Sequence, residues 1–106
     1  MPSKLQRARR PVGEVFPLSV AGAGDRGVIV RVGGQVDDAD DGSLGRTELE
    51  RRLLEMGFVE GARIKVLHEG FIGRDPIAVQ LDDMRVALRR REAADVMVQS
   101  SAHDHD

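Results

Sequence analysis

The sequence predicts an all-β domain with one or two short helices, built as a small β-barrel of about five strands. Two observations support this. Short runs alternate between apolar and polar residues, which is the period of a strand with one buried face, and turn residues separate them. A single stretch with helical spacing, residues 47–61, follows the first confident strand, and closure of the sheet would remove its free edges. At 106 residues the chain has the length of one domain.

The helical stretch reads TELERRLLEMGFVEG. Thr47 is a suitable N-cap, and Gly57 suits the left-handed position that ends a helix. Leu49, Leu53 and Met56 recur at helical spacing and define one apolar face. We expect this helix to cover one end of the sheet, although an ordinary surface helix with an apolar stripe would have the same spacing.

The predicted strands begin with residues 28–32, where Val28, Val30 and Val32 share one face and Arg31 lies on the other. The later strands are residues 62–67, 77–81, 84–88 and 96–98. Asp82 and Asp83 form a tight hairpin turn between two of them. The side chains expected to face inward are Ile64, Val66, Ile77, Val79, Leu81, Met84, Val86 and Leu88.

Three connecting segments have less regular patterns. Residues 15–20 form either a first helical turn or a lead-in strand, and residues 89–95 form a charged bend with room for one helical turn. Residues 68–76 read as a long turn because they contain two glycines and a proline. Phe71 and Ile72 lie at its tip, and we expect them to pack back on the barrel rather than to remain exposed for a partner.

The domain boundaries follow from composition. Residues 1–14 are predicted to be a disordered basic tail, residues 15–99 the barrel domain, and residues 100–106 a disordered polar tail ending in HDHD. Residues 35–45 form an acidic loop inserted before the helix, and the spacing of its aspartates does not fit a calcium-binding loop. The HDHD end is either inert or a loose metal ligand.

Composition excludes several classes of function. The chain has no Cys, no Trp, no Tyr and a net charge of -2, which excludes disulfides, thiolate metal sites and aromatic platforms for nucleic-acid bases. No apolar run reaches the length of a membrane span, and no secretory signal is present, so we expect a cytoplasmic protein. We predict no catalytic residues, because His68 is isolated and the hydroxyl residues have no histidine beside them. We also predict no metal-binding residues.

Five blocks of the sequence resemble the FeoA family of the bacterial ferrous iron uptake system. They are GVIVRV from residue 27, LERRLLEMGFVEG from residue 49, IKVL from residue 64, DPIAV from residue 75 and RVALRRREAA from residue 85. The resemblance implies an SH3-like barrel and an accessory or regulatory protein that is not an enzyme. It also implies a partner, the membrane ferrous iron transporter, whose cytosolic part binds GTP. It supplies no metal-ligand positions.

Two surfaces are candidates for docking on that partner. One is the exposed face of the helix with Arg51, Arg52, Leu54 and Glu55, and the other is the loop with Phe71 and Ile72. An ordinary solvent-exposed face, with charged residues beside the apolar stripe that packs on the core, would explain the same helix residues without a binding role. We expect attachment to the membrane only through the partner and no cofactor, and we leave open a weak or indirect association with ferrous ion and weak self-association.

Two alternative functions have less support. The first is a metal-responsive sensory domain related to the SH3-like domains of metal-dependent transcriptional repressors. The chain has no helix-turn-helix, which argues against this alternative. The second is nucleic-acid binding through a basic patch of Arg85, Arg89, Arg90 and Arg91. The net negative charge and the lack of aromatic residues argue against nucleic acid, and the same patch could face anionic lipid head groups.

Overall fold

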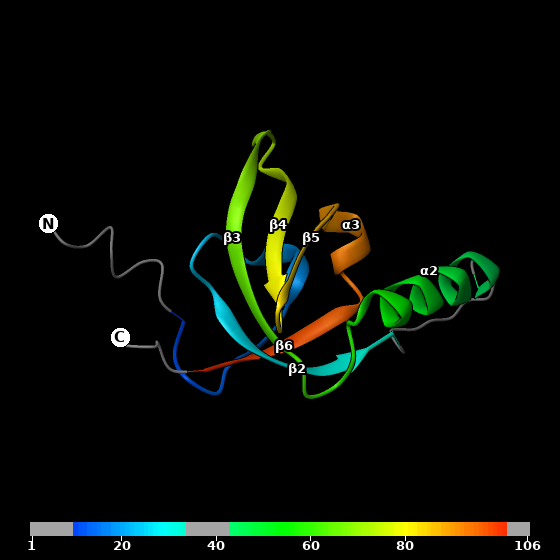
Figure 1. Ribbon diagram of the computed structural model, residues 1–106, viewed down its shortest axis with the longest axis horizontal. Coiled ribbons are helices and arrows are strands. Elements are labelled where there is room, and N and C mark those ends of the chain that lie inside the picture. Colours follow the sequence, from blue (N-terminus) through cyan, green and yellow to red (C-terminus); the bar gives the residue numbers. More distant parts are fainter. Residues whose placement is uncertain (1–9, 34–42, 102–106) are drawn as a thin grey trace, which may run out of the picture.

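In the computed structural model, which describes residues 10–33 and 43–101, six antiparallel strands form one sheet that curls around a core (Figure 1). The strands are β1 (Val15–Pro17), β2 (Arg26–Val32), β3 (Arg63–Ile72), β4 (Asp75–Leu81), β5 (Met84–Leu88) and β6 (Val96–Ser100), in the spatial order β1-β6-β2-β3-β4-β5. The helical elements are η1 (Leu18–Val20), α2 (Ser43–Met56) and α3 (Arg90–Ala93). The predicted mostly-β class with short helices is confirmed.

The segment at residues 15–20 contains both of the structures considered for it. Its first half is strand β1, which pairs antiparallel with β6 so that Phe16 lies opposite Val98. Its second half is the single 3-10 turn η1, which buries Leu18. The structure therefore has one strand more than the sequence predicted.

The core lies between the curled sheet and the C-terminal half of α2. Leu53 and Phe58 contribute fully buried side chains from the helix and the residues after it. Ile64, Val66, Ile77, Val79, Leu81 and Leu88 are buried from the strands, as the alternation predicted. Burial of each large side chain contributes about 1.5–3 kcal/mol to the stability of the fold.

Two predictions of strand faces were wrong. Val28, Val30 and Val32 do not share one face: Ile29 is buried between Val28 and the 37% exposed Val30, and a bulge between Ile29 and Arg31 then shifts the alternation so that Val32 packs against the core. A one-residue shift of this kind moves every later side chain to the other face. Met84 is 48% exposed because it begins the edge strand β5, which has no neighbour beyond it.

The helix α2 begins earlier than predicted and ends where predicted. Its first residue is Ser43, so Thr47 lies inside the helix and is not the N-cap. Gly57 follows the last helical residue with a φ of 107°. Backbone bonds from the Phe58 N–H to the Leu53 carbonyl (3.0 Å) and from the Gly57 N–H to the Leu54 carbonyl (3.0 Å) form a Schellman motif.

The segment at residues 68–76 is not a long turn. Strand β3 continues to Ile72 and β4 begins at Asp75, so the turn contains only Gly73 and Arg74, both with positive φ as in a type I′ turn. The resulting hairpin projects beyond the rest of the sheet (Figure 1). Phe71 and Ile72 are 101% and 84% exposed, so the expectation that they pack on the barrel was wrong.

The predicted boundaries at the ends fall partly on described residues. Within the span assigned to the N-terminal tail, Arg10 and Gly13 contact the barrel, and Ser100, assigned to the C-terminal tail, is the last residue of β6. Residues 1–9 and 102–106, which include the HDHD end, and most of the acidic loop lie outside the described residues.

Candidate functional site

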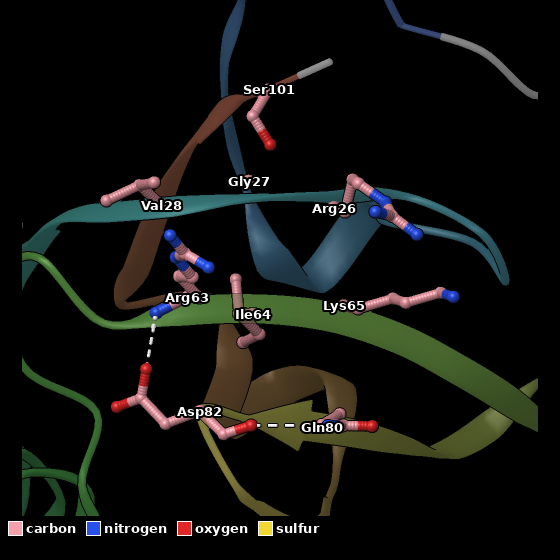
Figure 2. Close-up of a pocket in the computed structure, with 9 residues that line it drawn as sticks. All are labelled: Arg26, Gly27, Val28, Arg63, Ile64, Lys65, Gln80, Asp82 and Ser101. Carbon is pink, nitrogen blue, oxygen red and sulfur yellow. Dashed lines mark hydrogen bonds between the residues drawn. The ribbon is translucent and has the colours of Figure 1, made fainter. Parts of the chain in front are cut away.

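The outer face of the sheet carries an open groove with a volume of about 630 Å³ (Figure 2). Its floor consists of two rows of side chains that run across the strands. In one row Arg26 lies opposite Lys65, and Lys65 lies opposite Gln80. In the other row Val28 lies opposite Arg63. Figure 2 shows Asp82 beside Arg63 at the end of this second row.

The groove is positively charged. Arg26, Arg63 and Lys65 line it, and directly opposed like charges on neighbouring strands repel each other. The carboxylate of Asp82 accepts the backbone N–H of Arg63 at 3.0 Å, and the Asp82 carbonyl accepts the Gln80 side-chain amide at 3.2 Å. Arg63 and Lys65 form no ion pair within residues 10–33 and 43–101. Alternation with the inward Ile64 and Val66 places Arg63 and Lys65 outward, but Arg26 precedes the predicted strand at residues 28–32, so the sequence did not predict this groove.

Helix α2 presents the predicted charged face to solvent. Arg51, Arg52 and Glu55 are exposed, and Leu54 is 44% exposed beside the buried Leu53. The Arg52 guanidinium lies 3.8 Å from the Glu92 carboxylate, so the face is continuous with α3. An exposed ion pair at this distance contributes little to stability. The four predicted helix residues therefore form one polar surface with Leu54 at its edge.

Phe71 and Ile72 do not belong to that surface. Figure 1 shows the end of the β3–β4 hairpin at the top of the molecule and α2 at the right, on separate projections. The six residues predicted to contact a partner thus form two surfaces. We call the first the α2 face, made of Arg51, Arg52, Leu54 and Glu55. We call the second the hairpin tip, made of residues 70–73.

Arg90 has a role that the sequence did not predict. Its side chain is 20% exposed, and its guanidinium donates hydrogen bonds to the carbonyls of Ser19 (2.9 Å), Ala21 (2.8 Å) and Arg74 (2.9 Å) and to the Glu69 carboxylate (2.9 Å). The grouping of Arg90 with Arg85, Arg89 and Arg91 in one basic patch was wrong, because only those three are exposed. Arg90 instead connects α3, η1 and the hairpin.

The described part of the chain contains neither a metal-ligand cluster nor a membrane-spanning helix. Residues 10–33 and 43–101 hold no group of three or more His, Cys, Asp or Glu side chains arranged to bind a metal ion. His68 is exposed on β3. No helix in these two ranges is long and apolar enough to cross a bilayer.

A family model described as FeoA domain matches residues 16–100. A curated relative, the Fe(2+) transport protein A/Fe(2+) transporter FeoB fusion protein of Porphyromonas gingivalis, is 39% identical over 82 residues. That match covers 77% of this chain but only 8% of the fusion protein, so this chain corresponds to a small part of that relative.

Solved structures share the fold. A zinc complex of FeoA from Stenotrophomonas maltophilia, described as a unique procaryotic SH3 domain protein, is 31% identical with a TM-score of 0.60, over 79% of this chain and 89% of that chain. A manganese-dependent transcriptional repressor has a TM-score of 0.63 at 24% identity, over 87% of this chain and 45% of the repressor. At that identity the similarity to the repressor concerns the fold alone. The SH3-like architecture is confirmed.

Proposed function

This chain belongs to the FeoA family, and on that basis we propose that it docks on the cytosolic GTP-binding part of the membrane ferrous iron transporter and regulates uptake. Its role in ferrous iron transport follows from the family. The docking, the cytoplasmic location and the absence of a reaction of its own are parts of the proposal. The protein acts in it as a binding module.

One observation carries the proposal. In the Porphyromonas gingivalis relative, a segment similar to this chain is part of a fusion between Fe(2+) transport protein A and the transporter FeoB. Covalent fusion gives two modules a high effective concentration, which is useful when the separate modules bind each other. A separate chain such as this one lacks the covalent link, so it would need an interface of its own to bind the transporter.

The α2 face is the surface that we assign to this docking. It combines an exposed apolar residue at its edge, Leu54, with two exposed guanidiniums, Arg51 and Arg52, and arginine and large apolar residues are enriched where proteins bind each other. The face rests on the buried Leu53 and on the Schellman motif at Gly57, so its backbone is already ordered before binding. A preformed surface loses less conformational entropy on binding.

The test measures binding of the full chain to the isolated GTP-binding domain of the transporter, with GTP, GDP or no nucleotide, and with or without ferrous ion. We expect binding in at least one nucleotide state. The Arg52→Glu and Leu54→Ser variants should weaken it at least about tenfold, because each removes a contact of the size found at interface hot spots. Lys65→Glu reverses a charge on β3, away from α2, and serves as the matched control.

Two results would contradict the proposal. Absence of binding in every nucleotide state would exclude docking on this domain. Equal losses for Arg52→Glu and Lys65→Glu would show a nonspecific charge effect, and the α2 face would then not be the interface.

A further inference from the structure

We propose that the hairpin tip is a direct membrane anchor that inserts Phe71 and Ile72 into the interfacial region of an anionic bilayer. This goes beyond docking on the transporter, because it requires no protein partner. The inference rests on the exposure of two apolar side chains, on the absence of charge from residues 70–73 and on the arginines near them.

Both apolar side chains of the tip are exposed to solvent. Phe71 and Ile72 are neighbours at the end of β3, beside an irregularity between Glu69 and Ile72, and they are 101% and 84% exposed. A bilayer surrounds an inserted segment from all sides, so it can remove both side chains from water at once.

Residues 70–73 are uncharged, and their length fits shallow insertion. Residues 70–73 read Gly-Phe-Ile-Gly. At about 3.3 Å per residue, a tip of this size extends about 7–10 Å, which is the depth at which interfacial elements bury their apolar side. The ionised side chain in the turn is Arg74, which is 78% exposed, and its long stem allows the guanidinium to stay at the level of the lipid head groups.

The charges around the tip favour an anionic surface. Arg74 lies in the turn beside Gly73, and Arg89 and Arg91 are exposed at α3, which contacts β4. The nearest carboxylates are already engaged: Glu69 accepts hydrogen bonds from Arg90 (2.9 Å) and from the Ala23 N–H (2.9 Å). Asp75 accepts the backbone N–H of Arg90 at 2.8 Å. Each exposed arginine near an anionic leaflet strengthens attraction to it, which makes lipid the occupant that the charges complement.

The first experiment uses a single tryptophan as a probe. The chain contains no Trp, so Phe71→Trp in the full chain introduces its only indole. We expect its emission to shift to the blue on addition of vesicles of phosphatidylcholine with phosphatidylglycerol, and brominated acyl chains should quench it. Val12→Trp, at an exposed apolar position of the described chain far from the hairpin, is the matched control and should show neither change.

The second experiment measures cosedimentation with the same vesicles and no transporter present. The double variant Phe71→Ser with Ile72→Ser should bind at least about tenfold more weakly than the unchanged chain, because it removes both inserted side chains. Val12→Ser should bind unchanged. Arg74→Gln should reduce binding about fivefold on anionic vesicles and not on pure phosphatidylcholine. Because the substituted tip side chains are almost fully exposed, an unaltered circular dichroism spectrum is expected for the double variant.

Three outcomes would overturn the inference. The first is an indole emission of the Phe71→Trp variant that vesicles neither shift nor quench. The second is unchanged vesicle binding by the double serine variant. The third is that the double serine variant loses binding to the GTP-binding domain but keeps its binding to vesicles. The last outcome would make the tip a protein contact. The vesicle assays contain no transporter, so a negative result in them would not contradict docking through the α2 face. Likewise, absence of docking on the GTP-binding domain would not contradict membrane binding by the hairpin tip.

Discussion

The guanidinium of Arg90 lies 2.9 Å from the carboxylate of Glu69, and this contact joins α3 to the base of the β3–β4 hairpin. The other oxygen of Glu69 accepts the Ala23 N–H, which brings the loop after η1 into the same network. The hairpin that carries Phe71 and Ile72 is therefore fixed to two other elements. Its orientation depends on one arginine more than on any apolar contact at its exposed end.

Replacement of Arg90 by lysine should destabilise the fold although it keeps the charge. A lysine has no planar array of donors and cannot reach the carbonyls of Ser19, Ala21 and Arg74 together with Glu69. We expect a loss of about 2–3 kcal/mol in the free energy of unfolding, measured by urea denaturation. Arg91→Lys, on the exposed neighbour, should change it by less than about 0.5 kcal/mol. Equal effects of the two variants would refute the bridging role.

Leu53 and Leu54 provide a matched pair of substitutions at adjacent positions of α2. Leu53 is fully buried in the core, so Leu53→Ala should cost about 2–5 kcal/mol through lost burial and a residual cavity. Leu54 is 44% exposed, so Leu54→Ala should cost less than about 1 kcal/mol. Thermal and urea unfolding of both variants checks this. A similar cost at the two positions would mean that the packing of α2 on the sheet is described wrongly.

Gly57→Ala tests how α2 ends. The residue has a φ of 107°, which a side chain adopts only with strain, and an added Cβ would lie 3.2 Å from the Leu81 side chain. We expect a destabilisation of about 1–2 kcal/mol in urea unfolding. Gly57→Asn should cost less than alanine, because asparagine tolerates the left-handed region better. The reverse order would indicate that contact with Leu81, and not backbone strain, limits this position.

Arg10→Ala tests whether the segment before β1 belongs to the folded domain. The Arg10 guanidinium contacts Asp25 (3.1 Å) and the Val20 carbonyl (3.1 Å), and it lies 4.1 Å from the centre of the Phe16 ring. Asp25 is buried, so loss of its partner should cost about 1–2 kcal/mol and should speed amide exchange at Gly13. Arg31→Ala, at an exposed position of β2, is the control. Unchanged stability and exchange in Arg10→Ala would mean that the segment is not held by these contacts.

Local pattern predicted the strands and the end of the helix. The alternation in β3 and β4 assigned Ile64, Val66, Ile77 and Val79 correctly to the core, because a regular strand has only two faces. Gly57 ended the helix as expected, because the left-handed position is a local requirement of the backbone.

The errors depend on contacts between distant parts of the chain. The bulge in β2 is defined by pairing with β6, about 70 residues later, so nothing near Val30 could reveal it. Arg90 could not be separated from its arginine neighbours, because its acceptors at Ser19 and Ala21 lie some 70 residues away. The exposure of Phe71 and Ile72 depends on how far the hairpin extends beyond the sheet, which periodicity does not encode.

The position of β6 between β1 and β2 affects how the protein can fold during synthesis. The ribosome makes β1 and β2 first, yet neither has its shared neighbour until the last strand has left the exit tunnel. Until then the nascent chain can pair β2 only with β3, along the hairpin side of the sheet. Strand β1 therefore cannot pair with its neighbour β6 until nearly the whole domain has been translated. Completion of the sheet should occur late, after residue 100 emerges.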